Sequence, residues 1–195
     1  MEQLYRILKG APRVVDFVKT VNNVQISHSV CVFYNGDTQQ KLLEQFIQDG
    51  HEMYAPRGHS YWLSDHILDP LQKLSKSERV SPEELTAKQR FLSIGACGAI
   101  NIYSDLTQAF CNKVDMLGSL GAGKTAINNL YNWFLFETIA SDPQIPTWKD
   151  MDRKTAFIFR EDTDKDYQLP GDLPAMLYKI LGKRKCWLRP VADEL

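Results

Sequence analysis

Residues that commonly build metal and nucleophile sites are scarce in this chain of 195 residues. It contains four cysteines and four histidines. The cysteines, at positions 31, 97, 111 and 186, share no Cys-x-x-Cys spacing, and no two histidines stand in a His-x-x-x-His pair. A Gly-x-Ser-x-Gly segment is also absent. The sequence therefore predicts no metal site and no catalytic residue set, and an enzyme is the less favoured class.

Long apolar runs and an excess of one charge are absent as well. No run approaches the ~18 apolar residues that cross a membrane, and the first residues lack the apolar core of a signal peptide. Lysine and arginine total 23 against 24 aspartate and glutamate, a net charge of −1. Such a balance argues against a surface devoted to nucleic acid or anionic lipid. We expect a soluble, cytoplasmic protein with reduced cysteines.

The length fits one globular domain over residues 1–195. A polar stretch at 75–81 is the candidate linker between an N-terminal subdomain, 1–75, and a helical core, 82–195. Because a core of this size needs no disulfide or metal, the chain is expected to fold unaided.

Apolar spacing predicts a mainly α fold, with α+β as the alternative. We expect about six helices around a buried central helix at roughly 82–117, with two or three short peripheral strands. Ser81-Pro-Glu-Glu84 has the form of a helix start, and apolar residues three and four apart continue to Leu117. Other helices are expected at 2–20, from Asp37 to Gln48, at 61–74 and from Ala126 to Ala140. Strands are expected at 24–34 and 155–160.

The strongest motif is a phosphate-loop pattern over residues 118–125. Its glycines would let backbone N–H groups face phosphates, its lysine would reach the outer phosphates, and its threonine would bind Mg²⁺. The residues concerned are Gly118, Gly121, Gly123, Lys124 and Thr125. Mg-ATP or Mg-GTP would be the cofactor, and the enzyme class, if any, would be a P-loop NTPase.

The string Leu-Gly-Ala-Gly-Lys-Thr resembles the loop of a small bacterial ATPase family used in tRNA threonylcarbamoyl-adenosine synthesis. The resemblance is confined to residues 118–125 and implies nothing about the rest of the chain. Such a loop requires a buried strand before it, whereas residues 106–117 have a helical period. The competing interpretation is therefore a helical hairpin, in which Gly118 ends one helix and Lys124 lies near the turn.

Two further clusters of charged residues complete the candidates. Glu161 and Asp162 follow the strand expected at 155–160 and are the candidate Mg²⁺-associated acids. Asp162, Asp164 and Asp166 resemble the start of a calcium loop, but the positions that need glycine and glutamate hold Tyr167 and Leu173. A basic and aromatic cluster near the C-terminus could contact phosphate or bases; its members are Lys183, Arg184, Lys185, Trp187 and Arg189.

Three functions are expected, in this order. The first is a non-enzymatic helical protein that acts in assembly, as an adaptor, accessory or structural protein, through protein partners or self-association and without a cofactor. The second is a nucleotide-binding protein that uses Gly118–Thr125. The third and weaker function is nucleic-acid binding through residues 183–189.

Overall fold

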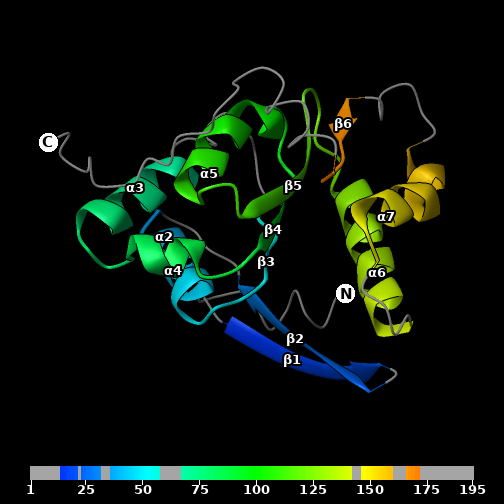
Figure 1. Cartoon of the computed structure of the whole chain (residues 1–195), viewed down its shortest axis with the longest axis horizontal. Helices are drawn as coiled ribbons and strands as arrows, with labels where there is room; N and C mark the ends of the chain where they lie inside the picture. The colour runs from blue at the N-terminus through cyan, green and yellow to red at the C-terminus, as the bar shows by residue number, and fades with distance from the viewer. Residues whose placement is uncertain are drawn as a thin grey trace, which may run out of the picture.

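The computed structural model describes residues 14–21, 23–31, 36–57, 67–141, 146–159 and 166–171. Its centre is a four-stranded mixed sheet with the strand order β3-β4-β5-β6 (Figure 1). The strands are β3 (Met53–Tyr54), β4 (Arg90–Ser93), β5 (Val114–Ser119) and β6 (Tyr167–Gln168). The first three are parallel, and β6 pairs antiparallel with β5.

Helices cover both faces of the sheet, which gives three layers (Figure 1). The helices on one face are α2 (Gly36–Gln48), α3 (Asp69–Lys76), α4 (Pro82–Thr86) and α5 (Tyr103–Ala109), with the 3₁₀ turn η3 (Ala99–Ile102). Those on the other face are α6 (Thr125–Ser141) and α7 (Trp148–Thr155), with the 3₁₀ turn η4 (Ala156–Ile158). This architecture places loops at the carboxyl ends of the parallel strands, where ligands of α/β sheets commonly bind.

Alternating side chains of the central strands feed two separate hydrophobic cores. Leu92, Val114 and Met116 join the first core, which α2–α5 cover. Phe91 and Leu117 join the second core, which α6 and α7 cover. Every residue of β4 and β5 is buried, because the sheet is covered on both faces.

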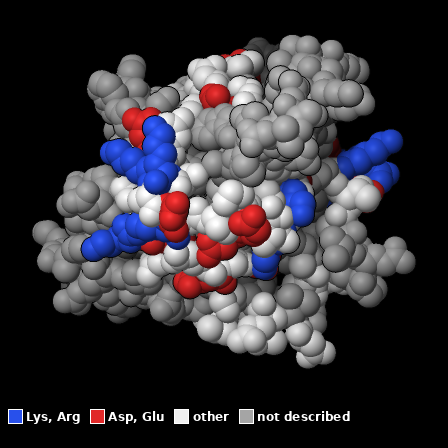
Figure 2. Space-filling model, turned by 60° about the vertical axis from the view of Figure 1, so that its left-hand side comes forward, with Lys and Arg blue, Asp and Glu red and all other residues white. Residues whose placement is uncertain are grey.

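The helical layer over the first core is held by a buried arginine. The Arg90 guanidinium donates to the carbonyl oxygens of Phe46 and Ile47 at the end of α2, of His51 just after it and of Glu84 in α4, at 2.8–3.1 Å. These carbonyls lie near helix C-termini, where a cation is stabilised. On the surface of this side, basic and acidic residues are interspersed among the described residues (Figure 2), as in the pair Arg79–Glu44.

A two-stranded antiparallel hairpin lies apart from the sheet (Figure 1). Its strands, β1 (Val14–Val21) and β2 (Val24–Cys31), pair from Val14↔Cys31 to Val21↔Val24. Asn23 has a φ of 67° in the turn, a conformation that asparagine tolerates better than most residues. Among the described elements outside the hairpin, β1 comes close to α6.

The mainly α prediction is wrong, and so is the central helix at 82–117. That range contains α4, β4, η3, α5 and β5, and the strands are central rather than peripheral. The helical period from Leu106 to Leu117 arose because α5 and a fully buried strand follow each other closely. Cys111 and Asn112, with φ values of 48° and 67°, form the turn between them. A strand buried on both faces has no alternating pattern that would have separated it from a helix.

Other element predictions had mixed outcomes. The strand at 155–160 is wrong, since Thr155 ends α7 and residues 156–158 form η4. The N-terminal helix is wrong over 14–20, which lie in β1, while residues 2–13 lie outside the described residues. The predictions for α2, for α6 and for β2 over 24–31 are confirmed, and Ser81 and Glu84 form the expected capping box. The helix expected at 61–74 begins at Asp69 within the described residues.

Candidate functional site

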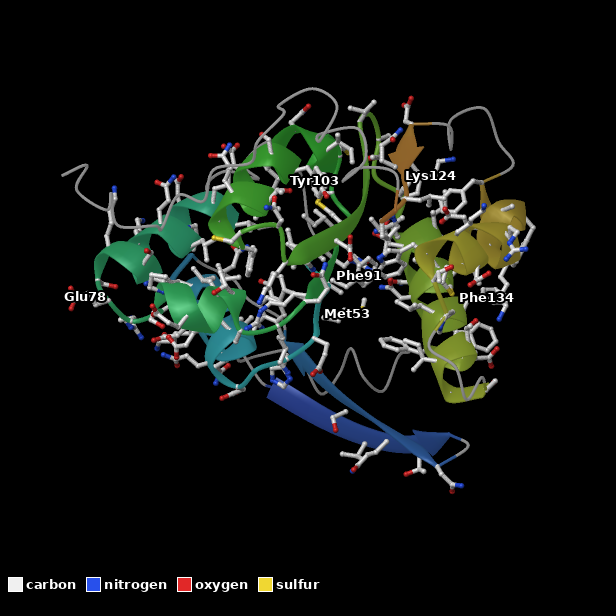
Figure 3. The ribbon with its side chains drawn as sticks, viewed as in Figure 1. Met53, Glu78, Phe91, Tyr103, Lys124 and Phe134 are labelled. Atoms are coloured by element: carbon white, nitrogen blue, oxygen red, sulfur yellow. The ribbon has the colours of Figure 1, made fainter. Side chains whose placement is uncertain are left out.

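The segment from Gly118 to Thr125 connects a buried strand to a long helix. Gly118 and Ser119 end β5, residues 120–124 form the loop, and Thr125 begins the 17-residue helix α6. Figure 3 shows Lys124 at the end of this loop, beside β6. The helix expected to continue through 106–117 ends at Ala109 and is followed by β5, so that expectation and the helical-hairpin interpretation that rested on it are wrong. The five glycine, lysine and threonine residues of the motif lie together at the carboxyl end of β5.

Main-chain N–H groups of the loop differ in what they bind. Leu120 N donates to Asp166 O at 2.9 Å, and Lys124 N donates to the Tyr167 hydroxyl at 2.5 Å. The N–H groups of Gly121, Ala122 and Gly123 donate to no other residue in the described part of the chain. Together with the N-terminal end of α6, they form a group of donors that suits an anion.

Glycine is required in this loop by close packing. A Cβ on Gly123 would lie 2.5 Å from the carbonyl carbon of Ala96. A Cβ on Gly118, at the end of β5, would lie 2.8 Å from the Cβ of Ala99. A Cβ on Gly121 would instead meet the Asp166 carboxylate. The loop is thus confined between the segment after β4 and the start of β6, and Asp166 places an acid against it.

A chain of buried polar groups lies behind the loop. The Tyr167 hydroxyl is 3.1 Å from Lys124 O and 3.0 Å from Asn128 Oδ1, and its single proton serves these two acceptors. Asn128 Nδ2 donates to Ser93 Oγ at 3.2 Å. Asn128 and Ser93 are fully buried. These bonds connect β6, the first turn of α6 and the end of β4, and so fix the entry of the helix.

Arg57 adds a cation at the same edge of the sheet. Its Nη1 donates to the carbonyl oxygens of Ser93 at 2.6 Å and Pro56 at 2.9 Å. Its Nε and Nη2 donate to Asn129 Oδ1 at 3.3 and 3.1 Å. Burial lowers the pKa of Arg57 from its usual value, yet an arginine remains charged at neutral pH. Among the described residues it has no carboxylate partner, so its charge stands unneutralised beside α6.

Several residues at this edge have no signature in the sequence, and two candidate groups lie elsewhere in the chain. Glu161, Asp162 and the cluster Lys183, Arg184, Lys185, Trp187 and Arg189 lie outside the described residues. In the sequence, Asp166 stands out only as part of the segment that resembles the start of a calcium loop. Its position against Gly121 depends on the pairing of β6 with β5, which no local pattern reveals. Arg57, Asn128 and Tyr167 carried no sequence signal at all.

The cysteines agree only in part with the expectation of reduced thiols. Cys97, in the loop after β4, is free and exposed. Cys111 is disulfide-bonded, so the expectation is wrong there. In the described ranges, no three histidine, cysteine, aspartate or glutamate side chains are grouped to hold a metal ion. None of the helices within these ranges is both long and apolar enough to traverse a lipid bilayer.

Comparison of the chain with known proteins identifies no relative. No family model, no curated protein and no solved structure matches the chain.

Proposed function

We propose that the protein binds the phosphate groups of a nucleoside triphosphate, with Mg²⁺, at Gly118–Thr125. The observation that carries the proposal is the order of elements: a strand buried inside a parallel sheet leads into the glycine loop, and a long helix begins at its threonine. The motif thus occurs in the surroundings that a phosphate loop requires. This proposal replaces the assembly function as the leading one.

Each residue of the loop has a proposed role. Gly121 and Gly123 let the main chain approach the phosphates, and the N–H groups of residues 121–123 donate to phosphate oxygens. Lys124 contacts the outer phosphates, and the Thr125 hydroxyl is a ligand of Mg²⁺. Asp166, which lies against Gly121, joins Glu161 and Asp162 as a candidate acid near the metal.

Arg57 is proposed to contribute long-range attraction for the phosphates. Its charge has no acidic partner among the described residues, and its donors hold the ends of β3 and β4 next to α6. An unneutralised cation in a partly buried position attracts an anion more strongly than one in water. The phosphates would supply the missing negative charge.

Calorimetric titration of Mg-ATP and Mg-GTP tests the proposal on the wild type, Lys124→Ala and the control Lys149→Ala. Lys149 is an exposed residue of α7 outside the loop, so its removal changes the net charge equally. We expect micromolar binding by the wild type and the control, and a loss of more than about tenfold in Lys124→Ala. No binding by a folded wild type, or equal losses in the two variants, would overturn the proposal.

A second candidate function, assembly through protein contacts, rests on the outer surface of α6. Leu130, Trp133 and Phe157 are 37%, 52% and 40% exposed. Phe134, labelled in Figure 3, connects Trp133 and Phe157: its ring is 5.7 Å from that of Trp133 and 5.1 Å from that of Phe157. Exposed apolar groups gathered in this way are typical of protein interfaces.

Sedimentation velocity over a range of concentrations tests this second function. Trp133→Gln should shift an associating wild type toward the monomer. Ile139→Gln, at an exposed apolar site six residues further along α6 and hence about 120° around the helix axis from Trp133, should not. A wild type that remains monomeric at every concentration would remove self-association, and a partner protein would then be required.

A further inference from the structure

The Tyr167 hydroxyl occupies a main-chain donor that phosphate binding would need. Lys124 N donates to this hydroxyl at 2.5 Å. Tyr167 is held in place because it pairs with Ser119 across β5 and β6, and its ring lies 5.8 Å from that of Phe159 in the second core. The hydroxyl therefore reaches the loop from a well-packed position.

A main-chain N–H has a single hydrogen, and the lysine N–H of a phosphate loop belongs to the group of donors that surrounds the phosphates. A phosphate oxygen and the Tyr167 hydroxyl would compete for the proton on Lys124 N. Both cannot accept it with good geometry, because the hydrogen-bond angle weakens steeply when it departs from linearity. Binding through this N–H thus requires Tyr167 to give up one of its bonds.

We propose that Tyr167 is a latch on the loop, which phosphate binding opens. This inference rests on the proposed nucleotide function. The cost of opening is limited, since the hydroxyl keeps Asn128 Oδ1 as an acceptor at 3.0 Å and loses only the bond that it accepts from Lys124 N. The latch couples the phosphate site to β6, whose hold on the loop weakens when the site fills.

Tyr167→Phe tests the latch because it removes only the competing oxygen. The unliganded variant should melt at a lower temperature than the wild type, since Lys124 N and Asn128 lose a partner. Its affinity for Mg-ATP should nevertheless rise by about three- to tenfold, the gain from removing one competing hydrogen bond. A purely structural role would lower the melting temperature and leave the affinity unchanged or weaker.

Tyr131→Phe is the matched control. Tyr131 lies on α6 in the same core, and its buried hydroxyl has no hydrogen-bond partner in the described part of the protein. The same chemical change there should leave the affinity for Mg-ATP unchanged. An equal gain in Tyr131→Phe would mean that loosening the core is enough, and the latch would be rejected.

The outcomes separate this inference from the function on which it rests. If neither the wild type nor Tyr167→Phe binds Mg-ATP, the proposed function and the latch both fail. If the wild type binds and the variant binds equally or more weakly, only the latch fails. Hydrogen exchange on the wild type gives an independent result: Mg-ATP should increase protection at 118–125 and decrease it at 166–171. Increased protection of both segments would overturn the latch even if the variant does not fold.

Discussion

Two neighbouring strands of the sheet, β4 and β5, are followed by similar sequences whose main-chain N–H groups are used differently. β4 is followed by Gly95-Ala96-Cys97-Gly98 and then Ala-Ile-Asn, and β5 by Gly121-Ala122-Gly123-Lys124 and then, after Thr125, Ala-Ile-Asn. Both segments lie at the carboxyl edge of the sheet, and each leads into a helix. The helices cover opposite faces: η3 and α5 lie on the first core, and α6 lies on the second.

The two segments differ in how their main-chain N–H groups are used. After β4, Gly95 N donates to Pro56 O at 3.1 Å and Gly98 N donates to Gly121 O at 2.9 Å. After β5, the N–H groups at 121–123 have no acceptor among the described residues. Glycine content alone therefore does not distinguish a packing turn from a candidate binding loop. In the β4 segment, Ala96 N and Cys97 N also have no acceptor among the described residues, but the glycine N–H groups on either side of them are bound, whereas in the β5 loop three consecutive N–H groups are left over. Because Gly98 N binds Gly121 O, the β4 segment supports the β5 loop.

The largest expected effect is at the contact between the two segments. Gly123→Ala would bring a methyl group 2.5 Å from the Ala96 carbonyl carbon, and main chain on both sides cannot move aside cheaply. We expect a loss of about 3 kcal/mol in the free energy of unfolding. Gly121→Ala meets only the end of the Asp166 side chain, which can rotate, and should cost less than about 1 kcal/mol. Urea unfolding measures both, and equal losses would show that the segments are not in firm contact.

A smaller loss is expected from Arg57→Met, which retains an unbranched apolar stem without the charge. The carbonyl oxygens of Ser93 and Pro56 would lose their charged donor, and Asn129 would lose its link to β3. We expect about 2 kcal/mol of destabilisation. Arg153→Met, at an exposed residue of α7, should cost under about 1 kcal/mol. If the two arginines prove equivalent in urea unfolding, Arg57 does not fasten the β4 segment to α6.

The smallest effect is expected at the start of η3. Gly98 has a φ of 64°, so Gly98→Ala should cost about 1 kcal/mol, whereas Gly98→Asn should cost less because asparagine tolerates this conformation. Neither change removes a donor from the β5 loop, and Mg-ATP affinity should stay within about twofold of the wild type. A large loss of affinity in a stable Gly98 variant would mean that both segments contact the ligand.

Local patterns predicted the parts of the fold in which one face of an element is apolar or a cap is present. α2, α6 and the capping box of Ser81 belong to this group. The same patterns failed at β4 and β5, because residues such as Val114 and Leu117 face different cores and leave no polar face in the sequence. Mistaking β5 for a helix also hid the strand that the phosphate-loop pattern requires.

The candidate site likewise contains residues that a local pattern reveals and residues that only the fold brings together. Its loop was found because Gly121, Gly123, Lys124 and Thr125 are adjacent in the sequence. Arg57, Tyr167 and Asp166 reach the site from β3 and β6, and Asn128 faces Ser93 only because α6 packs on the sheet. Such contacts depend on strand pairing between distant segments, and a single sequence contains no record of them.

The two cores also differ in the stretch of chain that each one needs. Those described residues that form the first core all fall between Leu43 and Met116, whereas the second core begins at Phe91 and requires Tyr167. During synthesis from the N-terminus, one side of the sheet can be complete before the glycine loop has been translated. We expect the nascent chain to present the edge of β5 as a finished template, onto which the loop, α6 and finally β6 are added in the order of their translation.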